Sequence, residues 1–325
     1  MYRSTAARAA LLFLALVLAT ACAASGGAAG TGPSQAAIAP SPSPSASSAF
    51  PVTVEAANGD VTLDAPPEAI VSLSPTATEM LFAVGAGDQT VAVDSFSNFP
   101  AEAPTTDLSA SEPNIEAIAG YAPDLVVFAD GPEDLEPSLA ELDIPVLQLP
   151  AATTLDDTYA QIAQIGAVTG NSDGAATLIE QMSTDIGELI AGAPSPAASA
   201  TVYHELDDTY YSATSATFIG QLYGMLGLGN IADEAEGAAG DYPQLSSEYI
   251  IDANPTLIFL ADTECCGQTA ETVAQRPGWD EIDAVAGDGV IELDDDVASR
   301  WGPRVVDLLE TIAAAVETHV DAGGS

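Results

Sequence analysis

The chain of 325 residues carries 48 acidic side chains against five basic ones, all of them arginine, for a formal net charge of −43 at pH 7. A surface of this charge repels nucleic acid and anionic lipid, so both are excluded as partners. The acidity is either an adaptation of the surface to high salt or acid or a composition bias of the lineage, and the sequence leaves both open.

Residues 1–21 have the features of a lipoprotein signal peptide. Arg3 and Arg8 precede an apolar run, and small residues stand before Cys22. The run is shorter than the ~20 apolar residues that a transmembrane helix needs. We predict that Cys22 becomes the lipidated first residue of the mature chain and holds it at the extracytoplasmic face of the cell membrane. The alternative is an ordinary signal peptide that is cleaved near Ala24 and discards Cys22.

Residues 22–50 form a predicted flexible tether. They are mostly Ala, Gly, Ser and Pro without a charge, so they cannot bury a core. The remaining ~275 residues exceed one typical core and suit two lobes. We predict an N-terminal lobe over 51–168, a linking helix within 169–195 and a C-terminal lobe over 196–325.

Short apolar runs that alternate with helical segments predict a parallel sheet in the N-terminal lobe. The expected strands are 70–73, 90–93, 125–128 and 146–149, and the expected later helices lie around 132–142 and over 154–167. The segment Thr76-Ala-Thr-Glu79 is typical of a capping box that opens a helix. That structural role is sufficient for Glu79.

The segment Ser172–Ile190 is predicted to form one helix of about 28 Å, at 1.5 Å per residue. This length is sufficient to bridge two lobes. After Ala200 the pattern restarts with predicted strands at 201–204 and 290–292 and helices at 217–226 and 303–319. The expected fold class is α/β, with two lobes that each hold a mainly parallel sheet flanked by helices, joined by a single long α-helix.

One helix and strand unit occurs twice. EAIAGYAPDLVVFAD begins at Glu116 and EYIIDANPTLIFLAD begins at Glu248, and both place a proline and a final Ala-Asp at the same offsets. In each copy we expect a short helix stopped by the proline, then an apolar strand that ends before Asp130 or Asp262.

Three segments give the chain a resemblance to the cobalamin and iron-siderophore binding proteins of ABC importers. They are Ile70–Pro100, Pro113–Val127 and Leu293–Leu309, and the similarity covers nearly everything after residue ~50. The resemblance implies a non-enzymatic receptor without a cofactor of its own, expected to be monomeric. Its partners would be a metal chelate carrying iron or cobalt and a permease dimer with its ATPase. The motifs are much less specific for the ligand.

Ligands of open α/β sheets bind outside the carboxyl ends of the strands, which directs attention to the loops there. Phe96 and Phe99 lie in the polar loop VDSFSNFP, and each offers a flat apolar face. The resemblance places a ligand-touching aromatic at Phe96 and another at Tyr242. Tyr210 is a further candidate, although one of the pair Tyr210 and Tyr211 is expected in the core. Local packing is the alternative for the two phenylalanines.

Four polar or bulky residues complete the candidate ligand site. The resemblance implies that Arg300 reaches the ligand, and the alternative is an ion pair with an acid of 294–296. Trp301 stands where cobalamin-binding relatives often carry a small residue. Asp130 and His204 lie at strand ends, although a single histidine is more often simply hydrogen bonded.

Cys265 and Cys266 are adjacent and become the only remaining cysteines once Cys22 is lipidated. Adjacent Cα atoms are ~3.8 Å apart, below the usual 4.4–6.8 Å of a disulfide. Three states stay open: a vicinal disulfide that forms a stiff apolar wall of the site, two free thiols, or a metal or redox role.

Glu116 and Glu248 begin the two repeated units. The resemblance matches Asn114-Ile115-Glu116 and Ser246-Ser247-Glu248 to positions where the family's glutamates engage arginines of the permease. An acid in the first turn of a helix is also favoured by the helix dipole, which is the structural alternative.

Enzymatic motifs are missing from the sequence. It contains no GxSxG, HExxH, P-loop or GxGxxG pattern. Two other kinds of binding protein remain as alternatives. One is a surface sensing or adhesion lipoprotein without transport, and the other is a metal-ion receptor, for which two histidines are few.

Overall fold

A computed structural model describes residues 50–196, 199–236 and 238–320. The predicted signal peptide, Cys22 and the tether up to residue 49 lie outside the described residues. Among the described helices, none combines the length and the apolar character that crossing a bilayer requires.

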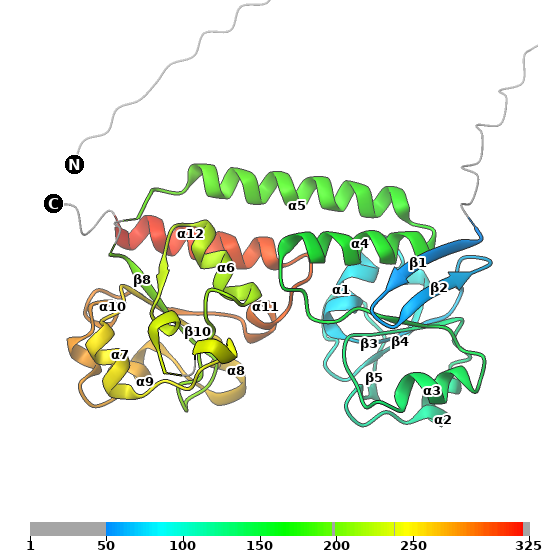
Figure 1. Ribbon diagram of the computed structural model, residues 1–325, viewed down its shortest axis with the longest axis horizontal. Coiled ribbons are helices and arrows are strands. Elements are labelled where there is room, and N and C mark those ends of the chain that lie inside the picture. Colours follow the sequence, from blue (N-terminus) through cyan, green and yellow to red (C-terminus); the bar gives the residue numbers. More distant parts are fainter. Residues whose placement is uncertain (1–49, 197–198, 237, 321–325) are drawn as a thin grey trace, which may run out of the picture. The chain divides into compact units, whose positions relative to one another are not determined.

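The described N-terminal part holds a hairpin and a five-stranded parallel sheet (Figure 1). The hairpin pairs β1 (Val52–Ala56) with β2 (Gly59–Leu63) in antiparallel fashion. The sheet has the order β5-β4-β3-β6-β7, formed by β3 (Ile70–Leu73), β4 (Thr90–Asp94), β5 (Thr105–Leu108), β6 (Leu125–Phe128) and β7 (Val146–Gln148). All four residues of β3 and of β6 are buried, as expected for central strands covered by helices on both faces.

Helices connect these strands and cover the sheet. They are α1 (Pro75–Ala83), α2 (Ile115–Ala119), α3 (Leu135–Ala140) and α4 (Leu155–Thr169), with a short turn η1 (Gly87–Gln89). The cap of α1 differs from the prediction, because Ser74 is the N-cap and its Oγ accepts from Ala77 N. The proposed capping box at Thr76 and Glu79 is therefore wrong, and Pro75 opens the helix at the position where proline is favoured.

The long helix α5 spans Ser172–Gly192, close to the predicted 172–190. It packs against α4 and against the final helix α12 (Val305–Val320). Ala175, Met182 and Ile186 of α5 are buried in the largest apolar cluster.

The second described sheet is also parallel, with the order β11-β10-β8-β9. Its strands are β8 (Thr201–Glu205), β9 (Gly229–Asn230), β10 (Leu257–Leu260) and β11 (Val290–Glu292). Its helices are α6 (Phe218–Met225), α7 (Ser247–Ala253), α8 (Thr263–Cys266), α9 (Ala270–Ala274), α10 (Asp283–Ala286) and α11 (Asp295–Ser299), with short turns η2 (Ile231–Glu234), η3 (Ala238–Gly240) and η4 (Trp279–Glu281). The predicted α/β fold with parallel sheets flanked by helices is confirmed.

The repeat is structural as well as sequential. α2 is followed by β6 and α7 by β10, and the residue before the proline has a left-handed backbone in both copies, with φ of 50° at Ala122 and 47° at Asn254. The N-caps are Asn114 and Ser246, whose side chains accept from Ala117 N and Tyr249 N. Each unit therefore carries its glutamate as the second residue of the helix.

Candidate functional site

Aromatic side chains are exposed near the carboxyl ends of strands, and they include Phe99, which is 43% exposed in the loop after β4. Phe96, in the loop after β4, is 68% exposed; Tyr242, ahead of α7, is 52% exposed; and Tyr211, after β8, is 40% exposed. Tyr211 is bridged to Gln244, so the two tyrosine loops lie side by side. Large aromatic faces left in water at a strand edge are typical of a binding surface.

The neighbouring Tyr210 has a different environment. Its ring stacks on Trp279 at 5.7 Å between centroids, and the Arg276 guanidinium lies 5.4 Å from its centre. Tyr210 packs against the apolar cluster of the second sheet, so the exposed member of the pair is Tyr211. We therefore prefer Tyr211 to Tyr210 as the candidate for ligand contact.

The backbone of the Phe96 loop is held while its ring stays exposed. Ser97 Oγ donates to Asp94 Oδ1 at 2.6 Å, and Arg300 Nη2 donates to the carbonyl of Phe96 at 3.0 Å. Burial raises the pKa of Asp94, and the hydrogen bonds from Ser97 oppose this shift. A fixed loop presents the aromatic face with little conformational entropy left to lose on binding.

Arg300, a predicted ligand contact, is only 7% exposed. Its guanidinium donates to Glu79 at 2.8 Å and to Asn98 Oδ1 at 3.1 Å, in addition to Phe96, and it forms an ion pair with Asp296. The ion pair with an acid of 294–296, named above as the alternative, is thus present. In this geometry Arg300 positions the Phe96 loop, and both of its terminal nitrogens, Nη1 and Nη2, are engaged within the protein.

Glu79 is the centre of this network. Its side chain is 1% exposed and accepts from Arg304 at 2.6 and 3.1 Å as well as from Arg300. Arg304 thus pairs with an acid of α1, far from it in the sequence. The three side chains join α1 to the segment that precedes α12.

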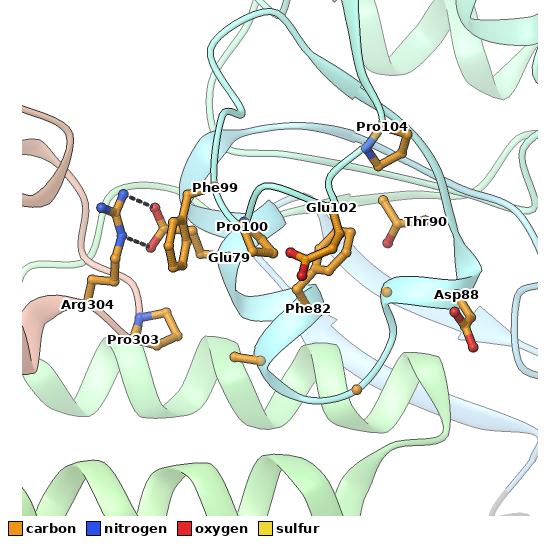
Figure 2. Close-up of a pocket in the computed structure, with 13 residues that line it drawn as sticks. Glu79, Phe82, Asp88, Thr90, Phe99, Pro100, Glu102, Pro104, Pro303 and Arg304 are labelled. Carbon is orange, nitrogen blue, oxygen red and sulfur yellow. Dashed lines mark hydrogen bonds and ion pairs between the residues drawn. The ribbon is translucent and has the colours of Figure 1, made fainter.

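Phe99 lines a cavity of about 800 Å³ beside this network (Figure 2). Figure 2 shows Arg304 and Glu79 joined next to the Phe99 ring, and the Arg304 guanidinium lies 4.4 Å from the ring centre. The cavity extends to Thr90, the first residue of β4, and Phe96 does not line it. Of the two phenylalanines of this loop, Phe99 alone lines the cavity.

His204 and Asp130 lie in contrasting places. His204 is fully buried and its Nδ1 hydrogen bonds to the Tyr223 hydroxyl at 2.7 Å. Burial lowers the pKa of His204 to about 4, so the ring is neutral near pH 7. This placement favours the hydrogen-bonded alternative over ligand binding. Asp130 is exposed and accepts from Gly131 N.

Cys265 and Cys266 are joined by a vicinal disulfide, and both are exposed on α8. Their turn is held by Asp295, whose carboxylate accepts from the backbone amides of Thr263, Glu264 and Cys265.

Trp301 packs against α4. Its Nε1 donates to Gln161 Oε1 at 2.9 Å, and its carbonyl accepts from Thr158. The indole is half-buried against the largest apolar cluster. The indole of Trp301 is therefore accommodated by packing against α4.

Glu116 and Glu248 are both exposed. Within the described residues, no hydrogen bond or ion pair engages either carboxylate. The same residues contain no group of three or more His, Cys, Asp or Glu side chains placed to hold a metal ion, so the alternative of a metal-ion receptor finds no ligand cluster there.

Two parallel α/β sheets and a long helix that packs on both α4 and α12 are typical of the solute-binding proteins in which one helix links two α/β parts. The family model of periplasmic binding proteins matches residues 70–297. The chain belongs to the periplasmic binding protein family, and the predicted membership is confirmed.

Two relatives are similar over most of the chain. An ABC transporter substrate-binding lipoprotein of Bacillus subtilis is 30% identical over 277 residues, covering 82% of this chain and 86% of the relative. A cobalamin-binding protein of Halobacterium salinarum is 31% identical over 276 residues, covering 82% and 74%.

Solved structures confirm the fold. The periplasmic vitamin B12-binding protein of Vibrio cholerae aligns with a TM-score of 0.63 at 24% identity, covering 80% of this chain and 99% of that one. A periplasmic heme-binding protein of Roseiflexus aligns with a TM-score of 0.67 at 24% identity, covering 78% and 99%.

Proposed function

We propose that this chain is the lipid-anchored substrate-binding protein of an ABC importer, and that its ligand is a metal chelate of the cobalamin type, which it delivers to a permease dimer with its ATPase. Family membership supports the role in transport, and the names of the similar proteins from Bacillus, Halobacterium and Pectobacterium support the anchor and the corrinoid. Iron-siderophores, the other ligand class that the sequence predicts, and heme are the competing ligands.

The exposed Phe96 carries this proposal. A phenylalanine that is 68% exposed on a loop fixed by Arg300 and Ser97 is an apolar face presented to solvent. Corrins, porphyrins and catechols all offer flat or apolar surfaces to such a ring. Tyr242 and Tyr211 would contact the ligand from the second sheet, with hydroxyls suited to the polar edge of a chelate.

The ligand is tested by titrating the intrinsic fluorescence of Trp279 and Trp301 with cobalamin, ferric siderophores and heme in turn. We expect cobalamin to bind most tightly and Phe96→Ala to weaken binding by about 1–3 kcal/mol, the range for losing an aromatic platform. Tyr121→Ala is the matched control, because Tyr121 is 40% exposed but lies ahead of β6, at the opposite end of the strand. Equal affinities for Phe96→Ala and the unmodified protein would place the ligand elsewhere.

Anchoring is tested separately. Cys22→Ala is expected to release the protein from membranes, because the described helices include none that can cross a bilayer. The matched control removes the other two cysteines with Cys265→Ala and Cys266→Ala, and this variant should stay in the membrane fraction. If Cys22→Ala still sediments with membranes in high salt, the lipoprotein prediction is wrong.

A further inference from the structure

A pair of buried acids lies at the carboxyl edge of the second sheet, outside the ligand site described above. Glu205 is the last residue of β8, and Asp262 follows β10, the neighbouring strand that places Leu260 opposite Glu205. The amide of Ala261 donates to the carbonyl of Glu205 at 2.9 Å. Both Glu205 and Asp262 are 0% exposed.

The two acids share one nearby cation. Arg276 Nη1 and Nη2 each donate to Glu205 at 2.6 Å, and the guanidinium also lies 4.5 Å from the centre of the Trp279 ring. Both carboxyl oxygens of Asp262 are buried without a hydrogen-bond partner in the described part of the chain. One guanidinium that already forms a bidentate pair does not neutralise a second buried carboxylate, and an unpaired buried charge is costly.

The electrostatics of Asp262 follow from these neighbours. Burial raises its pKa to about 7, the Glu205 carboxylate adds to the shift, and Arg276 opposes it. Asp295, on α11, also raises the pKa. Tyr203, on β8, faces the same cluster, and its buried hydroxyl has no hydrogen-bond partner among the residues that the structure describes. When Asp262 is protonated, its carboxyl group carries an O–H donor. The carboxylate of Glu205 is the acceptor for this donor, and this hydrogen bond favours the protonated form of Asp262.

The same cluster supports the turn that carries the disulfide. Gln268 N donates to the carbonyl of Asp262 at 3.2 Å, and Gln268 Oε1 accepts from Arg276 at 2.8 Å. On the other side, Asp295 accepts from the amides of the first residues of α8. When Asp262 is ionised, it competes with Gln268 and Glu205 for the guanidinium of Arg276. The charge of Asp262 therefore affects the hydrogen bond from Arg276 to Gln268, which stabilises this turn.

We propose that Asp262 and Glu205 form an acid–carboxylate pair that keeps one proton between them, and that loss of this proton releases the turn 263–268 at the edge of the second sheet. This pair makes the stability of the turn that carries the vicinal disulfide depend on pH near neutrality. It does not depend on the identity of the ligand proposed above, because Asp262, Glu205 and Arg276 are not among the residues proposed to contact that ligand.

The sign of the effect on stability follows from the raised pKa. Between about pH 4 and pH 7 the folded protein binds more protons at Asp262 than the unfolded chain does. The stabilising effect of the protonated pair is complete at low pH and is lost as the pH rises through about 7. Asp262→Asn keeps a donor for Glu205 but removes the titration.

The test compares the melting temperature of the full chain at pH 5.5 and 8.5 with that of Asp262→Asn. The unmodified protein should lose roughly 3–8 °C more than the variant across this interval. Asp130→Asn is the matched control, because Asp130 follows the corresponding strand β6 of the first repeat but is exposed. It should behave as the unmodified protein does.

Two further measurements test the proton and the turn. Infrared difference spectra should show a carboxylic-acid C=O band at pH 5.5 that disappears by pH 8.5 and is missing in Asp262→Asn. Amide hydrogen exchange over 263–268 at pH 8.5 should be faster in the unmodified protein than in Asp262→Asn.

Glu205→Gln, which removes the second acid, should also abolish the excess pH dependence of the melting temperature. It replaces Asp262→Asn in the test if Asp262→Asn does not fold. If Asp262→Asn and Asp130→Asn have identical melting profiles, the proposal of a shared proton is wrong. If the unmodified protein and Asp262→Asn exchange the amides of 263–268 at the same rate at pH 8.5, the proposed release of the turn is wrong.

Discussion

Glu79→Ala is expected to lower the free energy of unfolding by about 3–5 kcal/mol, the range for breaking a buried ion pair by removing one partner. The Glu79 carboxylate is 1% exposed, and the two guanidiniums that it accepts from are 6% and 14% exposed. Its removal leaves Arg304 buried without its partner and leaves Arg300 with Asp296. Urea denaturation at pH 7 measures the loss.

Glu102→Ala is the control for this experiment. Glu102 lines the same cavity, but it is exposed and forms no side-chain hydrogen bond within the described residues. Its replacement should change the free energy of unfolding by less than about 0.5 kcal/mol. Similar stabilities for Glu79→Ala and Glu102→Ala would show that the network contributes little to folding.

The double variant Glu116→Ala and Glu248→Ala is expected to leave ligand affinity within about twofold while it abolishes uptake in vesicles reconstituted with the permease. Both carboxylates are exposed, and each is the second residue of its helix in a repeated unit. Equivalent acids in two otherwise divergent units suit a partner that carries a pair of cationic sites. Such charges act mainly on the association rate and on the orientation of the bound receptor.

The helix dipole offers the competing explanation, in which each acid stabilises its own helix by about 0.3–1 kcal/mol. Glu112→Ala with Asp252→Ala is the matched control, since it removes one exposed acid ahead of α2 and one in the last turn of α7. This control should transport normally. Normal uptake by the variant that lacks Glu116 and Glu248 would leave those residues as helix-stabilising acids.

The strands that the sequence predicts best are those with continuous apolar runs. The bounds 70–73 and 125–128 match β3 and β6, because four buried residues in succession leave little doubt about where a central strand lies. β5 was missed because its sequence, TTDL, is mostly exposed at the edge of the sheet and carries no apolar run. The hairpin β1–β2 precedes the first predicted strand and was not anticipated.

The ion-pair network of Glu79, Arg300 and Arg304 could not be predicted from local sequence patterns. Thr76 and Glu79 match a capping motif in sequence, yet the partners of Glu79 are Arg300 and Arg304, which lie 221 and 225 residues away. Only the packed fold brings them together. The scarcity of cations was the signal that each arginine has a specific partner, and it did not identify the partner.

The tyrosine pair shows a second limit. Tyr210 and Tyr211 are adjacent, so an alternating pattern would place one inward and one outward without saying which. Tyr210 has a φ of 70°, which breaks the regular alternation of an extended segment. The stacking on Trp279 then fixes it in the interior.

The few arginines of this chain have a consequence for proteolysis. Trypsin cleaves after lysine and arginine but not before proline, and Arg276 is followed by Pro277. Beyond residue 8, this chain without lysine therefore offers trypsin Arg300 and Arg304. Their side chains are 6% and 14% exposed, and each forms an ion pair. A protease that must bind these guanidiniums in its own specificity pocket reaches them only when the fold opens. Tryptic cleavage of this protein therefore measures unfolding itself, with almost no background from surface sites.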